Sequence, residues 1–370
     1  MFESREPGGQ KVLKQRKGLP RPPRIKAFLD EYMVGQERAK KILSVAVYNH
    51  YKRVFFSEEN GSVQMKKGNV LMIGPTGTGK TLFAETLARV VGVPLSISDA
   101  TALTQSGYVG EDVENVVLRL YHAADSKIAQ CERGIIYIDE IDKIGRKSES
   151  PSLTRDVSGE GVQQSLLKII EGAVVDVPPH GGRKHPHEKM IPINTVNILF
   201  ICGGTFEGIE SIVARRLEQK TIGFGSGIMR AGRGHSIDRI LPEDLMAFGM
   251  IPEFLGRLPI IAKLEKLNEH DLVRILKEPK DAIIKQYERL FALEGMTLKF
   301  SGDALCAVAR EAIALGTGAR GLRAILEDLL LDVMYEIPED GERKEYVVTE
   351  ETVERLLSMS YGASVKEEAV

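Results

Sequence analysis

The segment at residues 74–81, which reads Gly-Pro-Thr-Gly-Thr-Gly-Lys-Thr, constrains the fold more than any other part of the chain. It matches the phosphate-loop pattern G-x-x-x-x-G-K-[ST], with an apolar run at 70–73 before it and an amphipathic stretch at 82–88 after it. A strand, a glycine-rich loop and a helix in this order direct backbone N–H groups and the positive helix end toward phosphate oxygens. The sequence therefore predicts a nucleotide-binding loop.

Each residue of this loop is a candidate nucleotide contact. Lys80 is expected to reach the β and γ phosphates, and the Thr81 hydroxyl to bind Mg²⁺. The full set of candidates is Gly74, Pro75, Thr76, Gly77, Thr78, Gly79, Lys80 and Thr81.

A second element, Gly-Ile-Ile-Tyr-Ile-Asp-Glu at residues 134–140, indicates what happens to the nucleotide. Its apolar part is long enough for one buried parallel strand. Asp139 is expected to hold the water shell of Mg²⁺, and Glu140 to orient or deprotonate the attacking water. An Asp-Glu pair after a strand is also common as a helix N-cap, but its combination with the phosphate loop favours hydrolysis. The chain is predicted to be an NTPase.

The composition excludes several other classes. The 370 residues suffice for two domains, and a net charge of −2 gives no general attraction to nucleic acid or membrane. Cys131, Cys202 and Cys306 lie far apart without a C-x-x-C pair, which favours buried thiols over disulfides or zinc. No apolar run approaches the ~20 residues of a membrane span, and no signal-peptide core is visible, so a cytoplasmic location is expected.

Apolar runs alternate with helical segments along the first two thirds of the chain. The runs lie at 70–73, 95–97, 135–138, 198–201 and 260–264. The alternation predicts an α/β domain with a parallel sheet flanked by helices, and a nucleotide site at the carboxyl ends of its strands. Long polar insertions at 145–161, 178–192 and 223–240 suggest functional loops.

From about residue 265 the pattern becomes mainly helical and predicts a smaller α+β C-terminal domain. Helices are expected at 269–277, 303–315 and 320–335, with a further one that has Pro279 in its first turn and runs to Leu293, and strands at 296–300 and 345–348. The expected organisation is a flexible lead-in at 1–23, a large ATPase domain at 24–264, a small domain at 265–362 and a disordered tail at 363–370.

Two arginines stand where a guanidinium could meet phosphate oxygens. Arg257 lies between helix-breaking residues, and Arg320 begins a helix of the small domain. Surface ion pairing is the ordinary explanation for an arginine. We instead expect Arg257 to act on the site of a neighbouring subunit, an effect of about 10³–10⁵ in hydrolysis rate. Arg320 is expected to sense the nucleotide in its own chain, whereas Arg323 is expected to be structural.

With these motifs, the chain resembles the AAA+ ATPases of the Clp/HSP100 group from about Arg24 to Gly362. The resemblance implies an ATP- and Mg²⁺-dependent unfoldase and translocase that works as a homo-hexameric ring. It also implies tagged protein substrates, adaptors, and delivery to a ClpP-like peptidase, with no protease site in the chain itself. Close members of the group usually begin with a zinc-binding domain of four cysteines, which this sequence lacks, so no zinc is expected.

The resemblance assigns two segments to the substrate pore. Tyr108 and Val109, between two glycines, are implied to line the axial pore and grip the polypeptide, where an aromatic side chain offers contact that is indifferent to sequence. A tight turn with a packed tyrosine is the alternative. The basic tripeptide Arg183, Lys184 and His185 is implied to select substrates by their C-terminal tags, although basic loops are usually just solvated.

Further residues take roles from the same resemblance. The tripeptide Ile222, Gly223 and Phe224 is implied to dock into apolar clefts of the peptidase ring. Val34 is implied to pack on the adenine base, with ordinary core packing as the alternative. Many AAA+ proteins place a sensor asparagine at the end of the fourth core strand, where this chain offers only Thr205 as a weak candidate.

Two other functions are alternatives to the unfoldase. A nucleic-acid motor or loader of the same ATPase class predicts a basic channel, against which the near-neutral charge and the aromatic loop argue. A switch that uses ATP only for assembly would need neither Glu140 nor Arg257.

Overall fold

The computed structural model describes residues 18–56, 65–104, 111–145, 159–179, 190–221, 240–336 and 345–360, and the account below concerns these residues. The chain divides into two compact units. The first comprises residues 1–27, 37–75 and 80–265, and the second residues 28–36, 76–79 and 266–370.

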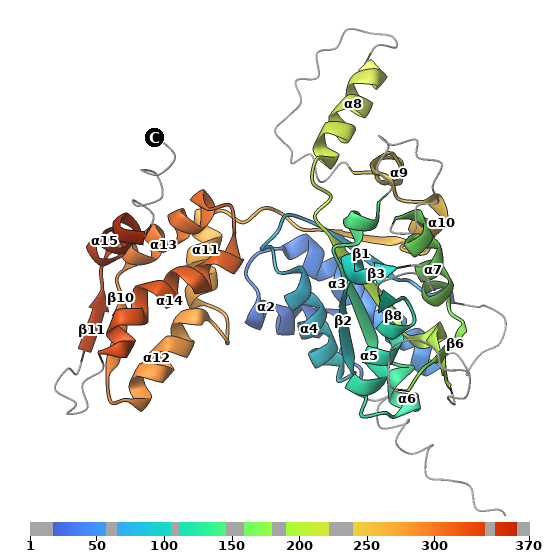
Figure 1. Cartoon of the computed structure of the whole chain (residues 1–370), viewed down its shortest axis with the longest axis horizontal. Helices are drawn as coiled ribbons and strands as arrows, with labels where there is room; N and C mark the ends of the chain where they lie inside the picture. Colours follow the sequence, from blue (N-terminus) through green and yellow to red (C-terminus); the bar gives the residue numbers. More distant parts are fainter. Residues whose placement is uncertain are drawn as a thin grey trace, which may run out of the picture. The chain divides into compact units, whose positions relative to one another are not determined.

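The first unit is built on a five-stranded parallel sheet in the order β2-β5-β8-β1-β9. Figure 1 labels three of these strands, β1, β2 and β8. Its strands are β1 Val70–Ile73, β2 Leu95–Asp99, β5 Ile135–Asp139, β8 Leu199–Gly204 and β9 Ile260–Lys263. Each strand coincides with one of the predicted apolar runs, so the sequence-based prediction of a parallel α/β sheet is confirmed.

Alternate side chains of the strands enter opposite faces of this sheet. Leu71, Ile136 and Phe200 belong to a core that includes α5 Asn115–Ala123 and α7 Glu160–Glu171. Met72 and Tyr137 point to the other face and are also fully buried. The helix α4 Lys80–Val91 contacts β5, β2 and β8, and α3 Glu37–Phe56 contacts β9.

Shorter elements complete the first unit, and two strand pairs among them were not predicted. Both pairs adjoin segments that the sequence pattern marks only as loops. One is the parallel pair of β3 Leu103–Thr104 and β4 Glu111–Asp112. The other is the antiparallel pair of β6 Val174–Val177 and β7 Ile191–Asn194. The helix α2 begins at Pro22, where a proline suits the first turn, two residues before the expected start. The boundary between the units falls within α2 Pro22–Tyr32, after Ala27. The remaining elements of the first unit are η1 Ala100–Ala102, α6 Ile128–Cys131, η2 Ile141–Ile144, η3 Thr195–Asn197, α8 Ile209–Thr221, α9 Pro242–Phe248 and α10 Pro252–Gly256.

The second unit is mainly helical with two short strands, as predicted, and the structure pairs these strands in parallel. Its elements are α11 Glu269–Lys277, α12 Ile283–Leu293, β10 Thr297–Phe300, α13 Gly302–Ala314, α14 Ala319–Tyr335, β11 Glu345–Val348 and α15 Glu350–Ser360. Its core brings Leu272, Phe291, Leu305 and Leu326 together from four of these helices.

The predicted place of Pro279 in the first turn of a helix is wrong. The helix α12 starts later, and Pro279 lies in the connection that follows α11. The Lys285 ammonium, on α12, donates to the carbonyls of Glu278 and Pro279 in the connecting segment, at 3.0 and 2.8 Å. A side chain thus satisfies backbone groups that a helical turn would otherwise have paired.

All three cysteines are free thiols. Cys131 and Cys202 are buried, and burial raises the pKa of each thiol to about 12, as expected for structural cysteines. Within the described part of the chain, no helix combines the length and apolar character needed to cross a bilayer.

Candidate nucleotide-binding site

Three adjacent strands deliver the predicted catalytic residues to one edge of the sheet. The order β5-β8-β1 is parallel throughout, so the carboxyl ends of these strands lie next to one another. The phosphate loop follows β1, Asp139 and Glu140 close β5, and Thr205 follows β8. Ligands of open α/β sheets bind at this kind of edge.

The glycines of the phosphate loop are required by its shape. A Cβ on Gly74 would lie 2.7 Å from Leu264 Cβ, because the loop begins in contact with the chain that follows β9. Gly77 and Gly79 have φ values of +76° and +88°, in the left-handed region that residues with a Cβ rarely adopt. The loop is therefore formed by backbone conformations that only this glycine spacing allows.

The Lys80 side chain is buried and turned back into its own loop. Its Nζ donates to the carbonyl oxygens of Gly74 and Pro75, at 2.7 and 3.0 Å. As the first residue of α4, Lys80 also lies at the positive end of a helix. The ammonium group is thus already directed to where the loop would hold phosphates.

The predicted Mg²⁺ ligands meet directly. The Thr81 hydroxyl donates to Asp139 Oδ2 at 3.2 Å, although the two residues are far apart in the sequence. A hydroxyl and one carboxylate suit Mg²⁺, which commonly takes its other ligands from water and substrate phosphates. Among the described residues, no group of three or more His, Cys, Asp and Glu side chains could hold a metal ion on its own.

Glu140 occupies an unusual position at the end of β5. Its backbone is left-handed, with φ of +55°, and its side chain is exposed to solvent. It stands at the N-cap of η2, but the side chain makes no capping hydrogen bond. The N-cap alternative therefore gives no account of this carboxylate, which is available to a water molecule.

A buried carboxylate that the sequence analysis did not single out, Asp142, lies in the turn that follows Asp139 and Glu140. It accepts hydrogen bonds from the Thr205 amide at 3.1 Å and the Thr205 hydroxyl at 3.0 Å. A Cβ on Gly204 would lie 2.7 Å from Asp142 Oδ1, so a glycine is needed for the carboxylate to fit. The hydroxyl of the proposed sensor Thr205 is thus engaged with Asp142. In the sequence, the second Asp of the Asp-Glu-Ile-Asp segment was the signal that could have identified this carboxylate.

Arg257 lies at the surface, at the end of α10. Its guanidinium pairs with Glu171, with Nη2 2.6 Å from Oε1, and 53% of its side chain is exposed. Its backbone carbonyl accepts a hydrogen bond from the buried Asn69 side chain at 3.0 Å. The backbone at Arg257 is therefore anchored while its charged end remains at the surface.

A buried glutamine on α7, also missed in the sequence analysis, connects the segments that carry Glu140 and Arg257. Gln163 Nε2 donates to the carbonyl of Ile144 at 2.8 Å and that of Gly249 at 3.3 Å. Its Oε1 accepts from the amide of Ile251 at 2.9 Å. The turn after Glu140 and the start of the helix that leads to Arg257 thus share one side chain.

Arg320 and Val34 belong to the second unit, which also includes residues 76–79 of the phosphate loop. Arg320 is exposed in the first turn of α14. Val34 is buried and lies in the segment of chain that connects α2 to α3. A Cβ on Gly77 would lie 2.7 Å from the carbonyl oxygen of Thr317, so the middle of the loop packs against the start of α14.

The predicted pore and docking residues lie outside the described residues. These are Tyr108, Val109, Arg183, Lys184, His185, Ile222, Gly223 and Phe224. Their roles stay predictions from the sequence.

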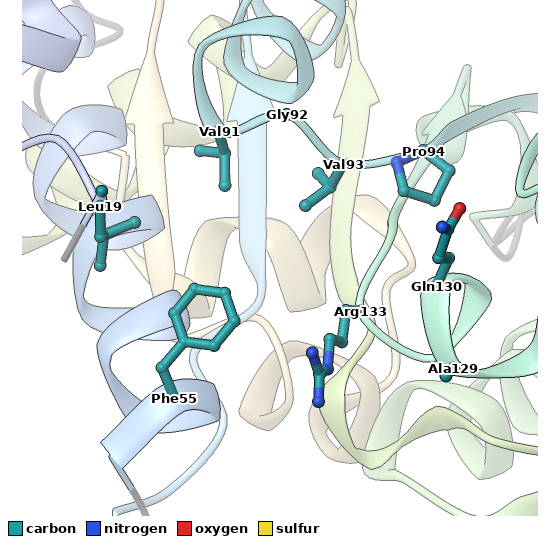
Figure 2. A pocket seen from close by; sticks show the side chains of 10 residues that line it. Leu19, Phe55, Val91, Gly92, Val93, Pro94, Ala129, Gln130 and Arg133 are labelled. Carbon is teal, nitrogen blue, oxygen red and sulfur yellow. The ribbon is translucent and has the colours of Figure 1, made fainter. Parts of the chain in front are cut away.

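A pocket of about 410 Å³ lies elsewhere in the first unit (Figure 2). Apolar side chains of Leu19, Phe55, Val91 and Val93 line it together with Arg133. The chain enters β2 and β5 beside this pocket, so the pocket lies at the amino ends of these strands, opposite the phosphate loop. It is not the nucleotide site.

Three basic side chains, apart from the nucleotide site, converge on the carbonyl groups of η3. His50 Nε2 lies 3.0 Å from the Asn197 oxygen, Arg53 donates to Val196 at 3.0 Å, and Lys67 donates to Thr195 at 2.9 Å. Burial, with a contribution from the nearby Arg53 charge, lowers the pKa of His50 to about 3. His50 is therefore a neutral, structural histidine at physiological pH.

Comparisons with known proteins match most of the chain. The family described as AAA domain (Cdc48 subfamily) matches residues 65–261, and the C-terminal, D2-small domain, of ClpB protein matches residues 267–353. Relatives from Borrelia duttonii (strain Ly) and Borrelia recurrentis (strain A1) are each 55% identical over 353 residues, which is 95% of this chain and 82% of the relative. Both are named ATP-dependent Clp protease ATP-binding subunit ClpX.

Proposed function

This chain belongs to the ClpX family of AAA ATPases, and from that premise we propose that it binds ATP on residues 74–81 and uses ATP hydrolysis to unfold proteins for a Clp-type peptidase. The observation that carries the proposal is the convergence of Thr81 and Asp139, at 3.2 Å, beside Lys80 and Glu140 at one edge of the sheet. A nucleotide-binding protein without hydrolysis would not need the exposed carboxylate of Glu140.

Each residue of the site has a distinct task in this proposal. Lys80 binds the β and γ phosphate oxygens, and Thr81 and Asp139 hold Mg²⁺, which when bound balances the negative charge of the phosphates. Glu140 orients the attacking water and accepts its proton. Val34 contacts the adenine base.

Two arginines complete the proposed cycle. Arg257 leaves Glu171 and binds the phosphates held by a neighbouring subunit, where a guanidinium stabilises the charge of the transition state. Arg320 links the nucleotide to the small domain. These roles follow the family resemblance, and the surface position of Arg257 supports its role.

The proposed assembly is a homo-hexamer that works with a ClpP-like peptidase. Tyr108 and Val109 would grip the substrate in the pore, and residues 183–185 would contribute to the choice of tagged substrates, with adaptors as further partners. Ile222, Gly223 and Phe224 would dock on the peptidase. Nucleic acid and membrane are not proposed as partners, and the cytoplasm is the proposed location.

The test is the loss of fluorescence from a stably folded, C-terminally tagged fluorescent protein, with ATP and ClpP present. The parent chain should cause this loss, Glu140→Gln should abolish it, and Tyr108→Ala should weaken it. Phe224→Ala should retain ATP hydrolysis but lose degradation. Vigorous hydrolysis that DNA stimulates, without any loss of fluorescence, would instead support a nucleic-acid motor.

A further inference from the structure

Tyr137 lies next to the proposed Mg²⁺ site without belonging to either nucleotide motif. It is fully buried in β5, two residues before Asp139, so both side chains point to the same face of the sheet. The Tyr137 hydroxyl donates to Asp139 Oδ1 at 3.0 Å. The other oxygen, Oδ2, accepts from Thr81 Oγ1 at 3.2 Å. The carboxylate is therefore held at both ends.

The adjacent strand leaves room for this hydroxyl. β8 pairs with β5, and Gly203 of β8 lies where any Cβ would collide with the Tyr137 hydroxyl. Gly203 does not have a positive φ, so its backbone conformation would accept other residues. The glycine is thus needed for the space it leaves, and that space holds the Tyr137 hydroxyl.

Burial alone does not explain the partner of this hydroxyl. A buried tyrosine needs an acceptor, but a backbone carbonyl suffices. Tyr51, equally buried in the first unit, donates to the carbonyl of Arg133 at 3.0 Å. Tyr137 instead binds the carboxylate of Asp139, and hydrogen bonds to a charged acceptor are the stronger kind.

We propose that Tyr137 is a positioning residue that fixes the Asp139 carboxylate in the orientation required for Mg²⁺, in the space left by Gly203. The proposal rests on the proposed function, because it takes Asp139 as a Mg²⁺ ligand. Residues that orient metal ligands typically contribute about 10- to 100-fold to metal affinity. Since the Glu140 amide also donates to Asp139 Oδ1, at 2.9 Å, the lower end of this range is expected.

The experiment measures binding of a fluorescent ADP analogue to the full chain as Mg²⁺ is titrated, and again in EDTA. Tyr137→Phe removes one oxygen atom and keeps the ring. It should raise the Mg²⁺ concentration for half-maximal effect about tenfold, with affinity in EDTA unchanged. Tyr51→Phe is the matched control, because it removes a buried tyrosine hydroxyl remote from Asp139, and it should change neither quantity.

Three other results of this titration would each contradict a different part of the proposal. If Tyr137→Phe and Tyr51→Phe have the same Mg²⁺ dependence as the parent, Tyr137 does not position Asp139. If Tyr137→Phe weakens binding equally in EDTA, its role is general packing and the proposal fails. If the parent itself shows no effect of Mg²⁺ on nucleotide affinity, the proposed site is wrong, and the inference fails with it.

Discussion

The buried side chain of Gln163 offers a direct test of how the segments that carry Glu140 and Arg257 are held together. Gln163→Met keeps the approximate length and volume of the side chain but removes its hydrogen bonds to Ile144, Gly249 and Ile251. The site is dry, since Gln163 has no exposed surface. The backbone groups that Gln163 binds therefore cannot form hydrogen bonds to water in place of those to its amide.

The expected cost follows from the two short bonds, at 2.8 and 2.9 Å. A buried polar group left without a partner costs about 1–3 kcal/mol. Loss of both should therefore destabilise the first unit by roughly 2–6 kcal/mol, with the longer bond to Gly249 adding little. Since 1.4 kcal/mol corresponds to about a factor of ten, opening of this unit should become about 30-fold to about 20,000-fold more frequent.

Native-state thiol labelling measures this opening in the full chain. Cys131 and Cys202 are buried in the first unit, so in a Cys306→Ser background their modification requires the unit to open. The matched control is Gln164→Met on the exposed face of the same helix, which should change the labelling rate by less than about threefold. Equal labelling rates for the two variants would refute the reasoning.

Three further predictions concern other parts of the first unit. Between pH 6.5 and 5 the unfolded chain binds a proton that the buried, neutral His50 does not, so acidification should lower the free energy of unfolding by about 2 kcal/mol. This component should vanish in His50→Gln, as measured by urea unfolding at both pH values; an unchanged pH slope would contradict it. Gly204→Ala would place a Cβ 2.7 Å from Asp142 Oδ1 and should destabilise by about 1–3 kcal/mol in thermal unfolding, whereas an unchanged melting temperature would count against the fit described above. Glu171→Gln removes the surface partner of Arg257 and, if that arginine acts on a neighbour, should raise the ATPase rate up to about fivefold. A fall in rate would mean that Glu171 orients the arginine for catalysis.

The fold of the first unit was largely predictable because its signals are local. Each buried parallel strand is a short apolar run, and the phosphate loop fixes the order of strand, loop and helix at 70–81. The pair β6 and β7 was missed because its strands alternate in burial instead of forming continuous apolar runs, and they flank a polar insertion. Pro279 was misplaced because proline suits both a first helical turn and a connection, and only the contacts of Lys285 distinguish the two.

The candidate site was predictable only in part, for a different reason. Lys80, Thr81, Asp139 and Glu140 belong to motifs whose chemistry can be read from residue order. Their supporting residues cannot be found in this way, because their roles depend on the register between strands and helices that are distant in the sequence. Tyr137 reads as one more apolar position, because nothing in the sequence shows that its hydroxyl lies against Gly203 of the neighbouring strand β8.

The left-handed backbone of Glu140 bears on the choice of reagents for capturing partners of this protein. A non-glycine residue held in this region carries strain of order 1 kcal/mol, which the surrounding structure must offset. Glutamine, the usual replacement for a catalytic glutamate, keeps that strain, whereas asparagine is among the residues best suited to the left-handed region. A capture reagent that must keep ATP uncleaved through long incubations is therefore better made as Glu140→Asn. This substitution removes the carboxylate and also lowers the backbone strain at position 140.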